Sequence, residues 1–318
     1  MKLFKPIKKL MAPLLIALLL LSACTSEGAE DTTTASPTEA DSSQSQTTAA
    51  QDIVPKCTAA ISYCVEDRSL LYSKQGNMKI YPASLTKLLT AYVALQYVSP
   101  DAEFTVGSEL DYVEKGSSLC LIKKNNILKL SDLLAGLLLV SGNDAAYTIA
   151  VGTARRADPK HNMSDAQAIK YFCGLMNDTA EKMGMVNSRF VNPDGWDNDD
   201  QYSTPTDLLI LTENALKNET IRTILGEKER KVTFVAGGSI TWKNHIKLID
   251  SSSEYYCADF IGGKTGTTDG AGYSLIAAFE RDGKTYITVV AGCKNDNERC
   301  SQTLELYTKT APSLAVNQ

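Results

Sequence analysis

A serine and a lysine stand three residues apart in the stretch Tyr-Pro-Ala-Ser-Leu-Thr-Lys, at Ser84 and Lys87. Apolar positions at helical spacing follow them, so the pattern predicts a helix over residues 84–97 with both side chains on one face, roughly 5 to 6 Å apart. Free N–H groups and the helix dipole would favour negative charge in its first turn. Serine needs a base to act as a nucleophile, and Lys87 is the candidate, because His161 and His245 lie in polar surroundings without a nucleophile signature.

The same short pattern also fits a helix N-cap followed by a solvated lysine. Two later motifs favour catalysis instead. Ser-Gly-Asn at 141–143 follows the apolar run 133–140, and Lys-Thr-Gly at 264–266 lies within Gly-Gly-Lys-Thr-Gly-Thr-Thr. The alternative for the last motif is a Gly-rich strand entry with an incidental lysine.

In their order and spacing these motifs resemble the serine D-alanyl-D-alanine carboxypeptidases, the low-molecular-mass penicillin-binding proteins. The resemblance runs from about residue 59 to about residue 307 and includes Phe-Val-Asn-Pro-Asp-Gly at 190–195 and Ala-Gly-Tyr-Ser-Leu at 271–275. It implies an α/β (α+β) fold, with an antiparallel sheet flanked by helices, a helical subdomain, and the active site in the cleft between them. It also implies cofactor-free, metal-free removal of the terminal D-alanine from peptidoglycan stem peptides through an acyl-enzyme, with β-lactam antibiotics as acylating inhibitors.

The resemblance implies a role for each motif residue. Ser84 attacks the carbonyl of the penultimate D-alanine, and a neutral Lys87 accepts its proton, with burial and the second cation at Lys264 expected to lower the pKa of Lys87. Ser141 supplies a proton relay, and Asn143 a hydrogen bond to the substrate amide. For Ser141 and Asn143 the alternative is helix capping.

The Lys-Thr-Gly motif is expected on an edge strand that faces the nucleophile. Lys264 and Thr265 would reach the cleft from it, and Gly266 would let the substrate backbone approach closely. In this family, backbone N–H groups form the oxyanion hole. The resemblance implies that the N–H groups of Ser84 and Thr267 form it here.

For the terminal carboxylate of the substrate, the resemblance points to Arg299, assisted by Thr265, because a guanidinium suits a carboxylate. Lys294 is the nearby competitor, and an ordinary surface arginine is the other alternative.

Two other functions are compatible with parts of the pattern. A serine β-lactamase shares Ser-x-x-Lys and Lys-Thr-Gly, but no Glu-x-x-Leu-Asn segment occurs between Ser141 and Lys264, and the second motif is Ser-Gly-Asn rather than Ser-Asp-Asn. A catalytically silent module that binds β-lactams or muropeptides is the second alternative, and the intact catalytic residues argue against it.

The first 23 residues have the pattern of a secretory signal, with four lysines before an apolar stretch over 10–21 that is too short to span a bilayer comfortably. The signal ends in Leu-Ser-Ala-Cys, which resembles the lipobox of bacterial lipoproteins. We therefore expect an exported protein that lipid on Cys24 anchors to the outer face of the cell membrane. The alternative is an ordinary signal peptide with a chance cysteine.

Residues 24–52 are expected to be the lipidated cysteine and a disordered tether, because this Ser/Thr-rich stretch has almost no large apolar side chain. Such a coil would span on the order of 30 Å. The catalytic domain is expected over 53–318. Removal of 1–23 takes four lysines and no acid, so the formal net charge moves from −5 to −9, which argues against nucleic acid as a partner.

Eight cysteines less the lipidated one leave an odd number, so at least one thiol is expected to be free or bonded to another chain. Cys57 and Cys64 lie on one extended segment, which makes a bond between them improbable. Cys293 and Cys300 flank a polar turn and are interpreted either as a bridge or as two buried thiols.

Strand patterns occur at both ends of the chain, over 59–65 and 70–73 and over 273–280 and 284–291. The last two flank Asp-Gly, a hairpin signal. Helical patterns lie between the two ends. Besides 84–97 they cover 130–140, 144–153, 165–183 and 206–217. This order predicts one α/β unit whose sheet joins the two ends of the chain.

Overall fold

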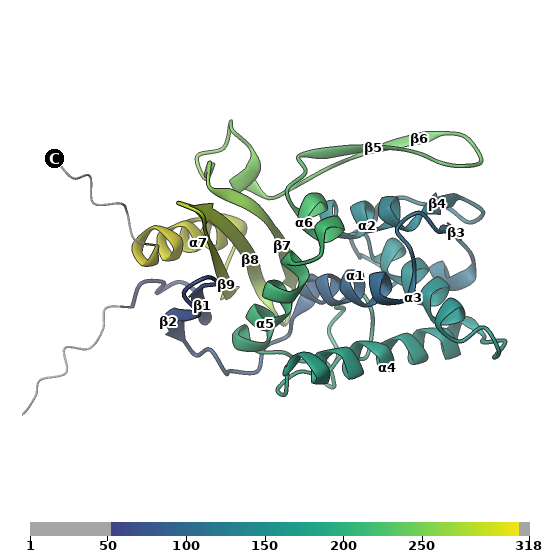
Figure 1. The fold of residues 1–318 in the computed structure, drawn as a ribbon, viewed down its shortest axis with the longest axis horizontal. Helices are drawn as coiled ribbons and strands as arrows, with labels where there is room; N and C mark the ends of the chain where they lie inside the picture. The colour runs from purple at the N-terminus through teal and green to yellow at the C-terminus, as the bar shows by residue number, and fades with distance from the viewer. Residues whose placement is uncertain (1–51, 312–318) are drawn as a thin grey trace, which may run out of the picture. The chain divides into compact units, whose positions relative to one another are not determined.

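One antiparallel sheet joins the two ends of the chain in the computed structural model, which describes residues 52–311. The strand order is β2-β1-β9-β8-β7, with β7 at an edge (Figure 1). The strands are β1 (Ala59–Cys64), β2 (Ser69–Lys74), β7 (Phe260–Thr268), β8 (Gly272–Arg281) and β9 (Lys284–Cys293). The predicted α/β fold and the expectation that its sheet unites the chain ends are confirmed.

The β8–β9 hairpin turns at Asp282 and Gly283, both with positive φ, of 55° and 73°. Turns of this kind match the right-handed twist of the flanking strands. Alternate residues of β8 then face opposite sides of the sheet. Leu275 and Phe279 belong to one buried cluster, and Ile276 to the other.

Each face of the sheet is covered by helices. On one face α7 (Asp296–Thr310) contributes Leu306 and Tyr307, and the Tyr307 ring stacks on Phe279 with 3.9 Å between centroids. The larger core, on the other face, takes in α5 (Pro205–Leu216) and the helical part of the molecule (Figure 1).

The helical part is built around the serine and its helix. A 3₁₀ turn, η1 (Ala83–Leu85), leads into α1 (Thr86–Tyr97), so Ser84 lies two residues before the first residue of the α-helix. The remaining helices are α2 (Leu130–Leu139), α3 (Asn143–Ala157), α4 (Asp165–Met183), α6 (Glu219–Leu225) and the 3₁₀ helices η2 (Ser108–Tyr112) and η3 (Lys247–Ile249).

The bounds of α4 agree with the prediction because its ends carry local signals, a capping box at Ser164 and a left-handed Gly184. Four short strands and α6 were not predicted. The strands form two hairpins, β3 (Glu103–Thr105) with β4 (Ile127–Lys129) and β5 (Glu229–Thr233) with β6 (Ser239–Lys243). Within the described residues, no helix is long and apolar enough to cross a bilayer.

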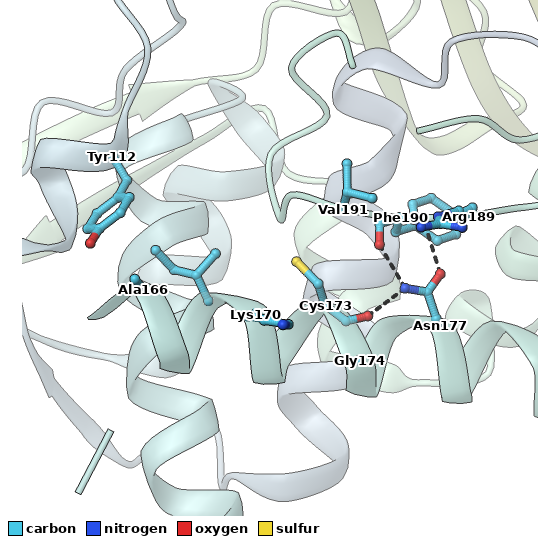
Figure 2. Close-up of a pocket in the computed structure, with 10 residues that line it drawn as sticks. Tyr112, Ala166, Lys170, Cys173, Gly174, Asn177, Arg189, Phe190 and Val191 are labelled. Atoms are coloured by element: carbon cyan, nitrogen blue, oxygen red, sulfur yellow. Dashed lines mark hydrogen bonds between the residues drawn. The ribbon is translucent and has the colours of Figure 1, made fainter. Parts of the chain in front are cut away.

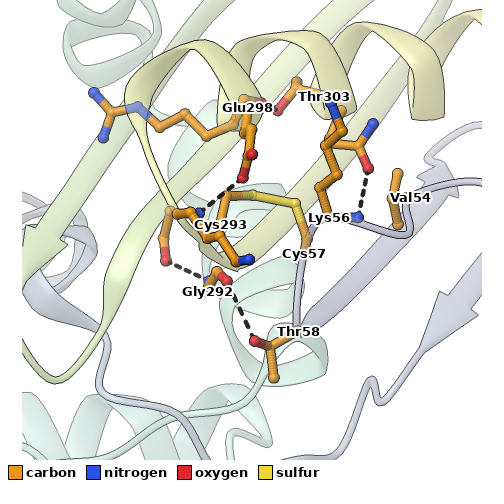
Figure 3. Close-up of a disulfide and its surroundings, with 12 residues drawn as sticks. Val54, Lys56, Cys57, Thr58, Gly292, Cys293, Glu298 and Thr303 are labelled. Carbon is orange, nitrogen blue, oxygen red and sulfur yellow. Dashed lines mark hydrogen bonds between the residues drawn. A yellow bond between two sulfur atoms is a disulfide. The ribbon is translucent and has the colours of Figure 1, made fainter.

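A disulfide joins Cys57 to Cys293 (Figure 3). The interpretation of Cys293 and Cys300 as a bridge is wrong, because Cys300 is a buried free thiol. The strand register explains the observed pair. Ala59 of β1 lies opposite Ala291 of β9, so the residues two positions further out, Cys57 and Cys293, also meet, with 4.4 Å between Cα atoms. The signal sequence and Cys24 lie outside the described residues.

Candidate active site

The nucleophile turn lies against the edge strand β7, and Gly266 makes this approach possible. A Cβ at Gly266 would lie 3.0 Å from Leu85 Cγ and 3.1 Å from the Pro82 carbonyl oxygen. A side chain there would therefore press on the turn that carries Ser84. The missing side chain of Gly266 thus makes room for η1. The expectation that Gly266 also admits a substrate backbone stays a prediction.

Ser84 and Lys87 are in direct contact, as the three-residue spacing predicted. Lys87 Nζ donates to Ser84 Oγ at 2.8 Å and to the carbonyl oxygen of Asp194 at 2.6 Å. The lysine side chain is fully buried. The alternative of a solvated lysine behind a helix cap is therefore wrong.

Burial lowers the pKa of Lys87 to about 8, because the charged ammonium loses its hydration. The carboxylates of Asp194 and Asp144 act in the opposite direction and raise it. The expected lowering by burial is confirmed. The effect of Lys264 on Lys87 that we expected is found on Lys264 instead, where the cationic Lys87 lowers the pKa.

Ser141 and Asn143 connect the α2–α3 loop to the two sides of the site. Ser141 has a φ of 60° and accepts a 2.9 Å hydrogen bond from Lys264 Nζ. Asn143 is buried in the first turn of α3, where its Nδ2 donates to Asp194 Oδ2. The N-cap of α3 is Gly142, with no side-chain cap, so neither residue has the capping role that we considered.

Lys264 reaches the site from β7 and is 1% exposed. Its Nζ also donates to the carbonyl oxygen of Thr265 at 2.8 Å. Burial first, and then the charges of Lys87 and Arg299, lower its pKa well below the usual value. The structure therefore holds two buried lysines close enough to repel each other.

Arg299 comes from the first turn of α7 and reaches β7. Its Nη1 donates to Thr267 Oγ1 at 2.9 Å, and its Nη2 pairs with Asp296 at 2.6 Å. The guanidinium also lies over the Tyr273 ring, 5.4 Å from the centroid. Arg299 is 9% exposed, so the surface-arginine alternative is wrong, and its buried Nε has no hydrogen-bond partner among the described residues.

The prediction missed Asp194, which links two of the motifs. Its carbonyl oxygen holds Lys87 and its carboxylate holds Asn143, whereas Trp196 donates its N–H to Asp194 Oδ1 at 3.2 Å. Burial raises the pKa of this carboxyl, and the nearby Lys87 lowers it. The signal was present in Asn-Pro-Asp-Gly at 192–195, but nothing local in it assigns the aspartate a role.

Side chains from three other elements fix the segment that carries Asp194. Asn177 of α4 bonds both backbone groups of Phe190, at 2.7 and 2.9 Å, beside a cavity of about 510 Å³ (Figure 2). Gln201 Oε1 accepts from Val191 N and Asn192 N, and Thr90 of α1 donates to the Pro193 carbonyl oxygen at 2.6 Å. The carboxylate beside Lys87 is thus held by a preorganised backbone.

Gly195 completes this segment. It has a φ of 88°, and a Cβ there would lie 1.8 Å from the carbonyl oxygen of Ala83, the residue before the nucleophile. Only glycine fits this approach. Within residues 52–311, no group of three or more His, Cys, Asp or Glu side chains is placed to hold a metal ion.

The site and the fold agree with the comparisons with known proteins. Residues 45–295 match the family described as D-alanyl-D-alanine carboxypeptidase. The D-alanyl-D-alanine carboxypeptidase of Streptomyces sp. strain K15 is 37% identical over 69% of this chain and 75% of its own length. DacC of Escherichia coli K12 is 33% identical over 74% of this chain, which spans 56% of the length of DacC.

Solved structures show the same similarity. The crystal structure of the Streptomyces K15 DD-transpeptidase has a TM-score of 0.73 and 31% identity, and covers 80% of this chain and 96% of its own. DacD of Francisella tularensis, at 24% identity and a TM-score of 0.66, supports the fold alone. The match to the family over residues 45–295, together with these relatives, shows that this chain belongs to the D-alanyl-D-alanine carboxypeptidase family.

Proposed function

We propose that this protein is a serine D,D-carboxypeptidase that removes the terminal D-alanine from peptidoglycan stem peptides through an acyl-enzyme. The observation that carries the proposal is the 2.8 Å contact between Ser84 Oγ and Lys87 Nζ, which places a nucleophile beside a buried amine with a pKa of about 8. The relatives named D-alanyl-D-alanine carboxypeptidase support it.

In the first step, Ser84 Oγ attacks the carbonyl carbon of the penultimate D-alanine while its proton passes to neutral Lys87 Nζ. The N–H groups of Ser84 and Thr267 stabilise the oxyanion that forms. The hydrogen bond from Lys87 to the Asp194 carbonyl oxygen aims the lysine at Ser84.

In the second step, the C–N bond breaks and the leaving D-alanine nitrogen takes the proton that Lys87 accepted from Ser84. Ser141 Oγ, hydrogen-bonded to Lys264 Nζ, is the relay for this proton. Water then attacks the ester while neutral Lys87 takes one of its protons. Lys87 passes this proton to Ser84 Oγ as the ester C–O bond breaks, and the shortened peptide is released.

Arg299 binds the terminal carboxylate in this proposal, with Thr265 and Thr267 beside it. The guanidinium is nearly buried and donates to Thr267 on β7 at 2.9 Å, so its charge lies beside the strand along which the substrate is expected to bind. Because Arg299 contacts Thr267 rather than Thr265, we assign the nearer supporting role to Thr267.

β-Lactams would acylate Ser84 in the same way, so penicillin binding follows from the proposal. A serine β-lactamase remains the alternative enzyme, and it differs in the speed of deacylation. The similar structure of the Streptomyces K15 DD-transpeptidase supports transpeptidation as a second candidate activity, in which an amine replaces water as the acceptor.

The test measures D-alanine release from a peptide ending in Lys-D-Ala-D-Ala, with and without an added amine acceptor, alongside benzylpenicillin turnover. Release that disappears in Ser84→Ala, with penicillin forming a lasting acyl-enzyme, supports the carboxypeptidase. Rapid penicillin hydrolysis without D-alanine release makes the protein a β-lactamase. Amide formation that exceeds hydrolysis would make the protein a transpeptidase. Penicillin binding without turnover of any peptide would show that the protein is a binding module without catalytic activity.

We further propose that residues 1–23 are a lipoprotein signal, that lipid on Cys24 anchors the protein outside the cell, and that 24–52 tether the domain 53–318. The support is the run of lysines, the apolar stretch and the Leu-Ser-Ala-Cys pattern in the sequence. Cys24→Ser should release the protein from membranes with its activity unchanged. Retention of this variant at the membrane would contradict the lipid anchor.

A further inference from the structure

A cavity of about 640 Å³ lies beyond the end of β7, outside the residues that take part in the proposed reaction. It is lined by residues 78–81, which lead into the nucleophile turn, by Asp199, Gln201 and Tyr202, and by the β7–β8 turn at 270–272. Thr58 and Gly292, next to the Cys57–Cys293 disulfide, complete the lining. None of them takes part in the proposed reaction.

The cavity adjoins the site. Tyr81 precedes Ser84 by three residues, so their Cα atoms are at most about 11 Å apart. The Tyr81 ring lies against Gly270, where a Cβ would be 3.1 Å from Tyr81 Cδ2. Asp197 accepts hydrogen bonds from Thr268 Oγ1 at 2.6 Å and from Gly270 N at 2.9 Å, and so joins the end of β7 to this turn.

The proposed binding mode sends the substrate in this direction. With its terminal carboxylate near Thr265 and Arg299 and its scissile carbonyl at the N–H of Thr267, an extended peptide along β7 continues past Thr268 toward Gly270. An extended chain advances about 3.3 Å per residue, so three or four residues reach the cavity from Ser84. In a peptidoglycan stem peptide, the sugar that carries the peptide follows at that distance.

The cavity lining suits a sugar. Tyr81 and Tyr202 provide aromatic rings, and two of the three turn residues, Gly270 and Gly272, have no side chain. Lys79 Nζ lies 3.8 Å from the centroid of the Tyr202 ring, and the lysine takes part in none of the ion pairs found within 52–311. Aromatic side chains together with a few polar groups suit an N-acetylated sugar, which presents both apolar C–H bonds and hydroxyl and amide groups.

Hydrogen bonds hold the residues that line the cavity in place. Tyr81 Oη donates to Asp199 at 3.2 Å, and the Gln201 amide is engaged with Val191, Asn192 and Trp196. Tyr202 exchanges both backbone hydrogen bonds with Arg189, which a change of side chain leaves intact.

We propose that this cavity binds the N-acetylated amino-sugar end of the peptidoglycan substrate, a site that rests on the proposed function. The protein then recognises its substrate at two places, the D-alanine terminus at Ser84 and the sugar at Tyr81 and Tyr202.

Calorimetry on the Ser84→Ala protein tests the site without turnover, with a pentapeptide ending in D-Ala-D-Ala and the same pentapeptide attached to its N-acetylglucosamine–N-acetylmuramic acid disaccharide. We expect the disaccharide to tighten binding by roughly threefold to tenfold. Tyr202→Ala on this background should remove that gain and leave the sugar-free peptide unaffected. Tyr202→Trp, which keeps an aromatic face, should retain it.

Tyr256→Ala is the matched control, because Tyr256 is 46% exposed and lies outside the cavity lining. Equal affinities for the two ligands, or equal weakening of both by Tyr202→Ala, would overturn the sugar site. D-alanine release from the sugar-free peptide by the protein with Ser84 intact reports on the proposed function separately. Its absence would refute the carboxypeptidase, and the calorimetry would still decide whether the cavity binds sugar.

Discussion

The two walls of the site each supply one buried lysine, but the charges around the two lysines are opposite. The helical wall consists of η1, α1 and the segments 141–144 and 190–196. It places the carboxylates of Asp194 and Asp144 near Lys87. Lys264, on the strand wall formed by β7 and Arg299, has only cationic neighbours that shift its pKa: Arg299 of the same wall and Lys87 of the helical wall. Similar burial therefore leads to different titration.

The difference explains how the site can use lysine as a base. Two ammonium groups that repel each other titrate as a pair, and the pair holds fewer protons near neutral pH than two exposed lysines would. The buried carboxylates of the helical wall offset part of this effect at Lys87, the lysine that touches Ser84. With a pKa of about 8, Lys87 is still neutral in a fraction of the molecules near neutral pH, and that fraction can act as the base without a histidine.

The sharpest way to separate the two walls is to remove each amine in turn. Lys87→Met should slow acylation by benzylpenicillin by about 10²- to 10⁴-fold, the usual contribution of a general base. Lys264→Met should cost less, because Lys264 contacts Ser141 rather than the nucleophile. Stopped-flow acylation rates measure both, with circular dichroism as the folding control. Equal losses of acylation rate in the two variants would contradict the assignment of Lys87 alone as the base.

A second test changes the backbone of the helical wall. Gly195→Ala should shift the nucleophile turn, because the new Cβ would lie 1.8 Å from the Ala83 carbonyl oxygen, and a shift of about 1 Å can cost on the order of a hundredfold in rate. Gly184→Ala is the matched control. Its φ of 89° is almost the same, but nothing lies within 4 Å of its Cβ.

Gly184→Ala should therefore lose only about 1 kcal/mol of stability to backbone strain and keep its acylation rate. Thermal unfolding and acylation are measured on both variants. Normal acylation by Gly195→Ala would mean that this wall adjusts more easily than the contacts indicate.

The third test concerns the strand wall. Arg299→Gln should raise KM for a peptide ending in D-Ala-D-Ala about tenfold to a hundredfold, because a charged hydrogen bond to the carboxylate is lost. The same peptide with a C-terminal amide is the control, and the variant should process it as the unchanged protein does. If the variant loses activity toward both peptides equally, Arg299 supports the fold of the strand wall and does not bind the substrate carboxylate.

The smallest expected effect is a shift in pH dependence. Acylation should rise with pH through about 8, because Lys87 must lose its proton to accept one from Ser84. Asp194→Asn removes a negative charge that raises the pKa of Lys87, so the rise should move to lower pH. A β-lactam whose own charge is constant over the range provides the rates. A profile that moves to higher pH would contradict this assignment.

The sequence predicted features that depend on neighbouring residues better than contacts between residues far apart in the chain. The Ser84–Lys87 contact follows from helical spacing and the bounds of α4 from its caps, so both were predicted. The support that Asp194 gives Lys87 joins residues 107 positions apart, and no pattern within either segment reveals it. To predict the disulfide partner of Cys57, one needs the register of β1 against β9. To predict the role of Gly266, one needs to know that η1 packs against it.

The Cys57–Cys293 bond also changes the topology of the chain. It closes residues 57–293 into a covalent ring that contains Ser84, the Ser-Gly-Asn loop and the Lys-Thr-Gly strand, while Arg299 lies outside on the tail. A protease that cut the β5–β6 hairpin once, near the exposed Val235, would open the ring without releasing a fragment. Nicked protein would then run as one piece on a denaturing gel and separate into two only after reduction.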